Sequence, residues 1–276
     1  MPPCAAATVR CLAEGMGSGS PRWHRIRASA PWHLHRTKFP KPDRPPLAGL
    51  DIVLNAAGPY AATGAPLRKL CLEAGTSYTD INGEIADFQA ALACGGEARS
   101  RKTAIIPGSG FGVVYGEALA IHAVKWLPAA NWLRLSIAPA SATHSPGALR
   151  SAAAVLAGGG YAISEGALRR EVPARTSWHI SWPGEAGKSR RYATVPRAEL
   201  IAAQRSTDVS TIVTGAEMPL TAVLLLRLAG PLPGMILRSM AARKSAPQTS
   251  GNQDVAHLKS RIFAEAGSAE GLYQRP

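Results

Sequence analysis

The chain has 276 residues, of which 46% are hydrophobic, and its formal net charge is +13 at pH 7. This length and hydrophobic content allow one large core or two smaller ones, and they exclude an intrinsically disordered chain. The positive charge favours partners that carry phosphate, such as a nucleotide, an anionic lipid surface or a nucleic acid, without distinguishing among them.

Residues 1–47 form a basic segment without a sustained apolar period, and we expect them to be irregular. The charge balance of this segment is Arg10, Arg22, Arg25, Arg27, Arg36, Lys38, Lys41 and Arg44 against Glu14 and Asp43. The run Gly15–Ser20 is rich in glycine, but a poor strand precedes it and a poor helix follows it. Because a dinucleotide-binding loop needs both elements, we expect no phosphate-binding loop here.

The four cysteines are Cys4, Cys11, Cys71 and Cys94, and they lack the spacing of a metal site. We therefore expect no metal ion, and a reducing, cytoplasmic location is the default. The N-terminal segment also lacks the continuous apolar core of a signal peptide. Cys71 lies on the apolar face of a predicted helix, so we interpret it as a core thiol.

Residues 48–128 alternate between strand and helix patterns. The strand Asp51–Leu54 is followed by a helix over Gly64–Gly75, with a proline near its start and a glycine at its end. The pattern continues with a strand over Tyr78–Ile81, a helix over Ile85–Ala98 and a strand over Thr103–Ile106. This order predicts the α/β fold class, with a partial Rossmann-like, doubly wound parallel sheet.

Small and polar residues follow each predicted strand, where ligands of open parallel sheets bind. The first strand is followed by Asn55, Ala57, Gly58, Pro59 and Tyr60, the second by Asp80, Asn82, Gly83 and Glu84, and the third by Pro107, Gly108 and Gly110. The limited side-chain bulk after the first strand would let a ligand approach the backbone. In the alternative interpretation, Gly58-Pro59 is a simple turn and Asn55 caps its strand.

Three ionisable side chains cluster at the end of the second strand, namely Tyr78, Asp80 and Glu84. A phenol or carboxylate at this position could relay a proton after hydride transfer, so these residues are the catalytic candidates. A structural interpretation is equally open, in which Asp80 caps the following turn and Glu84 starts the next helix at its positive end.

Residues 129–276 predict an α+β region. A helix over Gly116–Leu127 leads to the strand Leu133–Ile137, and a further helix is expected from Ser145 to Ala157. The alternating patterns of residues 166–182 and 190–195 indicate an antiparallel sheet. Trp178 and Trp182 share one face of a strand there, where they belong to the core or line a substrate cleft.

The most apolar run of the chain extends from Pro219 to Met240. Arg227, prolines and glycines interrupt it, so it is too broken for a membrane span and predicts two short helices instead. Arg238, Arg243 and Lys244 at its end suit contact with anionic lipid, and they equally suit a helix C-terminus.

Five stretches resemble, in order, a known family: Val53–Tyr60, Cys71–Glu84, Ile106–Phe111, Ser145–Ala148, and Val195–Leu200 with Arg205–Thr207. The chain resembles the saccharopine dehydrogenase-like NAD(P)-binding oxidoreductases, and among them the trans-acting enoyl reductase branch. The resemblance implies NAD or NADP as cofactor, a substrate and dimerisation domain, and a role in lipid metabolism. It also implies that the family's N-terminal glycine-rich turn and C-terminal end are missing.

The resemblance assigns the cofactor's ribose and nicotinamide side to the loop Asn55–Tyr60. It implies an NAD(P)-dependent oxidoreductase that acts on a hydrophobic carbonyl or enoyl substrate, and a homo-oligomer. The alternative is a catalytically inactive relative that serves as a structural or membrane-associated interaction protein. A nucleic-acid binder ranks last, because no basic run interleaved with aromatic residues lies on one predicted element. We expect a cytoplasmic protein, with peripheral membrane contact left open.

Overall fold

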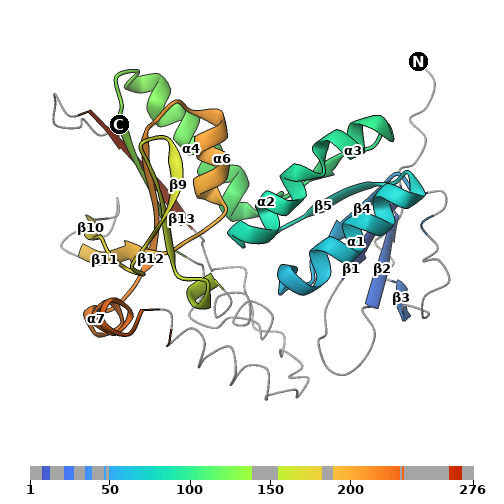
Figure 1. The fold of residues 1–276 in the computed structure, drawn as a ribbon, viewed down its shortest axis with the longest axis horizontal. Coiled ribbons are helices and arrows are strands. Elements are labelled where there is room, and N and C mark those ends of the chain that lie inside the picture. The colour runs from blue at the N-terminus through green and yellow to red at the C-terminus, as the bar shows by residue number, and fades with distance from the viewer. Residues whose placement is uncertain are drawn as a thin grey trace. The chain divides into compact units, whose positions relative to one another are not determined.

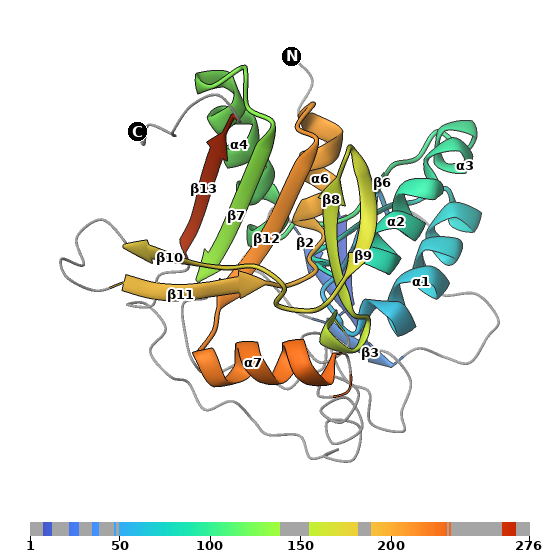
Figure 2. The same ribbon diagram turned by 60° about the vertical axis from the view of Figure 1, so that its left-hand side comes forward.

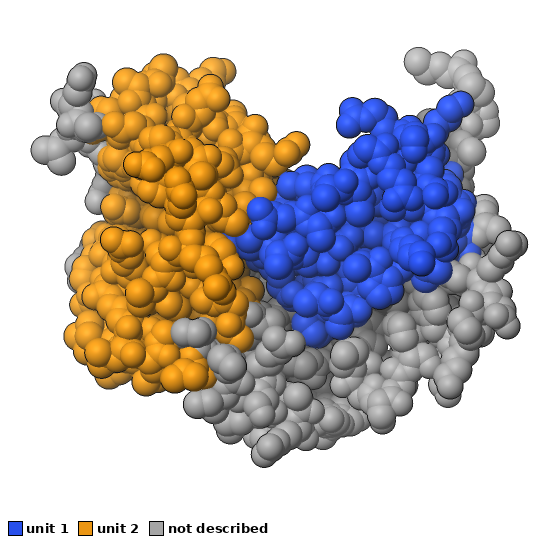
Figure 3. Space-filling model, in the orientation of Figure 1, with its two compact units in different colours: residues 1–110, 245–247 blue, residues 111–244, 248–276 orange. Residues whose placement is uncertain are grey.

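The computed structural model describes residues 8–12, 22–27, 35–38, 47, 50–138, 155–181, 189–230, 232 and 261–268. The chain forms two compact units: unit 1 comprises residues 1–110 and 245–247, and unit 2 comprises residues 111–244 and 248–276 (Figure 3). The sequence placed the boundary after residue 128, whereas the units divide after Gly110. The reason is that α4 (Phe111–Trp126) packs against α6 (Glu199–Ser206) and β13 (Arg261–Gly267) of unit 2.

Unit 1 is built on a six-stranded sheet in the order β3-β2-β1-β4-β5-β6 (Figure 1). Its strands are β1 (Thr8–Leu12), β2 (Arg22–Arg27), β3 (His35–Lys38), β4 (Ile52–Asn55), β5 (Ser77–Asp80) and β6 (Ile105–Ile106). The pairs β1–β4, β4–β5 and β5–β6 are parallel, while β2 pairs antiparallel with β1 and with β3. The predicted α/β class with a parallel sheet is confirmed.

The expectation that residues 1–47 are irregular is wrong for the three strands described there. β1 pairs in parallel with β4, and its last residue, Leu12, lies opposite Asn55. β1 pairs with β2 and with β4, and β4 begins about 40 residues further along the chain. The basic residues of β1 itself therefore gave no local indication of a strand. β-Pairing of this kind depends on cross-strand neighbours more than on the intrinsic preference of a short segment.

The helices of unit 1 begin and end close to the predicted positions. α1 spans Tyr60–Ala74, starting four residues before the predicted Gly64, and ends at Gly75, whose φ of 68° is left-handed. Its buried face contributes Leu67 and Cys71 to a core with Val53 and Tyr78. The predicted helix over Ile85–Ala98 is divided at Cys94 into α2 (Ile85–Ala93) and α3 (Gly95–Ser100).

Cys71 is fully buried in this core, which confirms its interpretation as a core thiol. Burial raises the pKa of the thiol to about 12, so the sulfur stays protonated at neutral pH.

Unit 2 contains a seven-stranded sheet with the main order β10-β11-β12-β7-β13, and β8 and β9 join it through β12 (Figure 2). The strands are β7 (Trp132–Ala138), β8 (Gly160–Ser164), β9 (Ala167–Glu171), β10 (Ser177–Ser181), β11 (Ser189–Thr194), β12 (Thr211–Glu217) and β13. Only the β12–β7 pair among them is parallel, so the predicted antiparallel character is confirmed.

A buried carboxylate joins two helices of unit 2. Glu199 of α6 is fully buried and pairs with Arg197, whose Nη2 lies 2.8 Å from Glu199 Oε1. Gly112 and Gly116 of α4 face this side chain, and a Cβ at Gly112 would overlap the carboxylate. The glycines therefore provide the space that lets α4 and α6 pack closely.

Trp178 of β10 packs in a core cluster with Ile180 and Tyr192, and its indole N–H donates to the Ser136 hydroxyl at 2.9 Å. This arrangement fits the core-packing interpretation of Trp178. Trp182, expected on the same face, lies outside the described residues, as does most of the helix predicted from Ser145 to Ala157.

Candidate functional site

The carboxyl ends of the parallel strands of unit 1 meet at one edge of the sheet. Leu12 of β1 lies opposite Asn55 of β4, which lies opposite Asp80 of β5. From β1 the chain continues to β2 and β3 on one side, and from β4 it continues to β5 and β6 on the other. The switch point, outside which ligands of such sheets bind, therefore lies between β1 and β4.

The glycine-rich run Gly15–Ser20 follows β1 but lies outside the described residues. Nine residues join β1 to β2, and the two strands are antiparallel. A crossover to a parallel strand needs a dozen residues or more, usually including a helix. The antiparallel β1–β2 pair thus differs from the dinucleotide fingerprint, in which the two strands that flank the helix are parallel.

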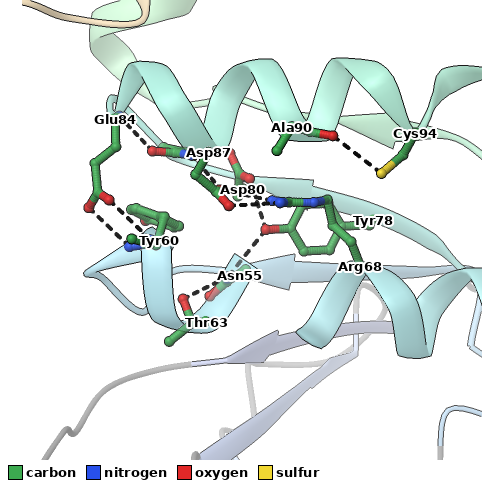
Figure 4. Close-up of polar contacts among 12 residues, drawn as sticks. Asn55, Tyr60, Thr63, Arg68, Tyr78, Asp80, Glu84, Asp87, Ala90 and Cys94 are labelled. Carbon is green, nitrogen blue, oxygen red and sulfur yellow. Dashed lines mark hydrogen bonds and ion pairs between the residues drawn. The ribbon is translucent and has the colours of Figure 1, made fainter. Parts of the chain in front are cut away.

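Asn55 fixes the loop at the switch point. Its side chain is fully buried, and its Oδ1 accepts the N–H of Ala57 at 3.0 Å. Its Nδ2 donates to the Tyr78 hydroxyl and to Thr63 Oγ1, both at 3.2 Å (Figure 4). The Thr63 hydroxyl in turn donates to the Ala57 carbonyl at 2.6 Å. Asn55 is therefore more than a strand cap, since it ties the loop both to α1 and to β5.

Asp80 joins the next two loops to each other. Its Oδ1 accepts the N–H of Asn82 at 3.0 Å and the N–H of Gly108 at 2.7 Å, while its Oδ2 accepts the Tyr78 hydroxyl at 2.8 Å. Burial raises the pKa of the Asp80 carboxyl, and it outweighs the lowering effect of these hydrogen bonds. Burial likewise raises the pKa of the Tyr78 hydroxyl.

Glu84 places its carboxylate at the N-terminus of α1. The two carboxylate oxygens accept the backbone N–H groups of Tyr60 at 3.0 Å and Ala61 at 3.1 Å. These are first-turn donors that a helix leaves unpaired, so Glu84 occupies the position where an anion would bind. In the structural alternative to a catalytic role, Glu84 starts the next helix. It does precede α2, but its charge serves the preceding helix, α1.

A buried ion pair behind these loops was missed in the sequence. Arg68 of α1 forms two hydrogen bonds of 2.7 Å with the carboxylate of Asp87 in α2, and Asn82 Nδ2 donates to the same carboxylate at 2.8 Å. Burial lowers the pKa of Arg68, but the hydrogen bonds and charge of Asp87 raise it further, so the guanidinium stays charged. One feature of the sequence could have indicated this ion pair: Arg68 lies next to Leu67, among the apolar positions of α1.

The remaining cofactor-binding candidates surround this network. Gly58 and Pro59 are half-buried and joined by a cis peptide bond. Tyr60 is buried, and this burial, together with the negative charges of Asp80 and Glu84, raises the pKa of its hydroxyl. Pro107 is half-buried, and the buried Gly108 has a φ of 74°. The structure thus brings the predicted residues of all three loops to one edge.

The ionisable side chains at this edge already have hydrogen-bond partners within unit 1. Tyr78, Asp80 and Glu84 are at most 7% exposed, and each forms hydrogen bonds within the network. Across the part of the chain that the structure describes, no group of three metal-binding side chains could hold an ion. What the edge can offer a ligand is therefore backbone, small side chains and fixed loops.

No protein-family model and no curated protein matches the sequence. Similar solved structures include apo saccharopine dehydrogenase (L-Glu forming) from Saccharomyces cerevisiae, with 12% identity over 65% of this chain and 43% of that chain and a TM-score of 0.41. GenD2 from gentamicin A biosynthesis, solved in complex with NAD, shows 10% identity over 81% of this chain and 54% of that chain, with a TM-score of 0.32. A probable dehydrogenase from Thermotoga maritima shows 13% identity over 61% of this chain and 51% of that chain, with a TM-score of 0.30.

The chain spans between 43% and 54% of the length of these three structures. At these identities and TM-scores, the likeness concerns the general architecture and assigns no cofactor, substrate or activity.

Proposed function

We propose that unit 1 binds NAD or NADP at the carboxyl edge of its parallel sheet, and that the chain is an NAD(P)-dependent oxidoreductase. The observation that carries this proposal is the buried network that fixes the loops after β4, β5 and β6. Asn55 holds the first loop, and Asp80 joins the second to the third. Loops that are already fixed lose little conformational entropy when a ligand binds, which favours a binding edge of this kind.

The loop after β4 suits the ribose and nicotinamide part of the cofactor. Ala56, Gly58 and Pro59 are half-buried and have little side-chain bulk, so a ligand can approach the main chain there. The first turn of α1 does not suit the pyrophosphate, because the Glu84 carboxylate already accepts its N–H groups. The phosphate contacts would have to come from another part of the chain.

When bound, the cofactor would supply the hydride chemistry, while the protein binds it, orients it and limits the access of water. The hydrogen bonds of Tyr78, Asp80 and Glu84 favour a positioning role for all three side chains. Their role in proton relay stays a prediction. The finer assignment, reduction of a hydrophobic carbonyl or enoyl substrate, rests on the sequence resemblance to the enoyl reductase branch.

A second candidate is a relative that keeps the sheet without binding a dinucleotide and acts as an interaction protein. Two observations favour it: Glu84 occupies the anion position of α1, and β2, which pairs with β1, is antiparallel to it. The first takes up donors that usually hold a pyrophosphate, and the second departs from the parallel strands of a dinucleotide-binding unit.

A titration of the full chain with NADH and NADPH, followed by nicotinamide fluorescence, separates the two candidates. Saturable binding in the micromolar range supports the oxidoreductase, and a preference for one of the two identifies the cofactor. A folded protein that shows no saturable binding up to millimolar concentrations contradicts it and supports the interaction protein. Circular dichroism of the same samples verifies that the protein is folded.

A further inference from the structure

The helix α7 (Leu220–Ala229) exposes a row of leucines on unit 2. Leu220, Leu224 and Leu228 follow one another at four-residue spacing and are 50%, 46% and 88% exposed. Leu225 of the same helix is also exposed, at 55%. Residues spaced by four lie on the same side of a helix, so these side chains form a continuous apolar surface, which we call the leucine face.

The opposite side of α7 is packed into unit 2. Val223 and Leu226 are buried in a cluster with Ala174 and Ala193. Arg227 also reaches back, and its Nε donates to the Ala174 carbonyl at 2.7 Å. Because α7 is held by these contacts, the leucine face cannot turn inward without breaking them.

The sequence around α7 is basic and free of acidic residues. Between Glu217 and Asp254 the chain contains no Asp or Glu. Besides Arg227, which is turned into unit 2, this stretch contains the basic residues Arg238, Arg243 and Lys244, which lie outside the described residues. An apolar helix face within a basic stretch complements an anionic lipid surface, because the apolar side chains enter the headgroup boundary while the cations contact phosphate. Within the described parts of the chain, no helix is long and apolar enough to cross a bilayer.

We propose that α7 is an interfacial helix whose leucine face inserts into the headgroup boundary of an anionic membrane. The helix lies on the bilayer, and the basic residues that follow it in the sequence add electrostatic attraction. This inference concerns unit 2 and does not depend on cofactor binding by unit 1.

Flotation of the full chain with phosphatidylcholine vesicles, with and without phosphatidylserine, tests the proposal. We expect the wild-type protein to float with the anionic vesicles, less with the neutral ones, and less at high salt. The double variant Leu224→Glu/Leu228→Glu should lower binding to anionic vesicles at least about tenfold, because two inserting side chains become charged. Both leucines are exposed, so the fold should be retained.

The matched control is Val114→Glu/Ile121→Glu on α4, where the two side chains are 48% and 45% exposed. It adds the same charge to another helix of unit 2 and should bind vesicles nearly as the wild type does. The proposal is overturned if the wild type does not float, or if both double variants lose binding equally. If the leucine face instead packs against a second copy of the chain, the wild type should be an oligomer in the absence of lipid, and Leu224→Glu/Leu228→Glu should dissociate it. That result would also overturn the membrane proposal.

Discussion

The carboxylate of Asp80 accepts the backbone N–H of Gly108 at 2.7 Å, and this hydrogen bond joins the loop after β5 to the loop after β6. The same carboxylate holds the Tyr78 hydroxyl and the N–H of Asn82. All of these groups are buried, so the loss of the carboxylate would leave several donors without a partner.

Replacing Asp80 should therefore lower the free energy of unfolding. We expect a loss of about 2–4 kcal/mol for Asp80→Ala, and a smaller loss of about 1–2 kcal/mol for Asp80→Asn, which keeps one acceptor oxygen. Urea unfolding at pH 7, followed by circular dichroism, measures both losses. Asp51→Asn, at an exposed position, is the control. A loss below about 0.5 kcal/mol for Asp80→Ala would contradict the structural role of the network.

The stability difference between the wild type and Asp80→Asn should depend on pH. Burial raises the pKa of Asp80 in the folded protein above its unfolded value of about 3.9. A carboxyl shifted in this direction stabilises the fold fully below its unfolded pKa, and this contribution is lost as the pH rises through the folded pKa.

The free energy of unfolding of the wild type should thus fall relative to Asp80→Asn as the pH rises from about 4 towards neutral. Urea unfolding of both proteins at a series of pH values measures this difference, in which the other carboxylates largely cancel. If the free energy of unfolding of the wild type instead rises relative to that of Asp80→Asn with increasing pH, hydrogen bonding outweighs burial in setting the pKa of this side chain.

The Arg68–Asp87 ion pair should show strong coupling in a double-mutant cycle. Asp87→Ala leaves the Arg68 guanidinium buried and unpaired, which should cost about 3–5 kcal/mol. Adding Arg68→Met should recover part of this loss, with a coupling energy of at least about 2 kcal/mol.

The control for this cycle is the pair Lys69 and Glu73 of the same helix. Lys69 Nζ lies 3.9 Å from Glu73 Oε1, and the two side chains are 76% and 53% exposed. Their coupling should stay within about 0.5 kcal/mol, because exposed pairs are solvated and screened. Equal coupling in the two pairs would show that burial does not set the strength of the Arg68–Asp87 interaction.

Gly64 should not tolerate alanine. A Cβ at this position would lie 2.5 Å from Asp87 Oδ2 and 2.6 Å from Arg68 Nη1, so Gly64→Ala should displace the ion pair and cost about 1–3 kcal/mol. A Cβ at Gly96 of α3 would meet open space, with nothing within 4 Å, so Gly96→Ala should be neutral or stabilise by up to about 1 kcal/mol. Thermal unfolding of both variants measures the contrast, and equal effects of the two substitutions would contradict the close approach.

The elements from β4 to α2 could be predicted from the sequence because local signals mark them. The apolar run before Asn55 indicates a buried strand, and Gly75 marks the end of α1 with the left-handed backbone that glycine favours. The start of α1 was placed too late. The first N–H groups of this helix are capped by Glu84, which lies 24 residues further along the chain and gives no local signal at Tyr60.

The candidate site was predicted only in outline. The strand ends carrying Asn55 and Asp80 could be located, because parallel strands end at one edge. The partners of these side chains could not, since they are set by tertiary packing: Arg68 and Asp87 are 19 residues apart, and Asp80 and Gly108 are 28 apart. The carboxylates looked catalytic in the sequence because nothing local shows that their hydrogen bonds are already made.

Binding of a dinucleotide at the carboxyl edge of the unit 1 sheet can be tested at two exposed alanines of α1. Ala61 lies in the first turn, next to this edge, and Ala74 ends the same helix about 20 Å away. In fluorescence titrations with NADH and NADPH, we predict saturable binding to the wild type, affinity about tenfold weaker or worse for Ala61→Trp through steric exclusion, and unchanged affinity for Ala74→Trp. No saturable binding to folded wild-type protein, or equal affinities for the two variants, would contradict the claim.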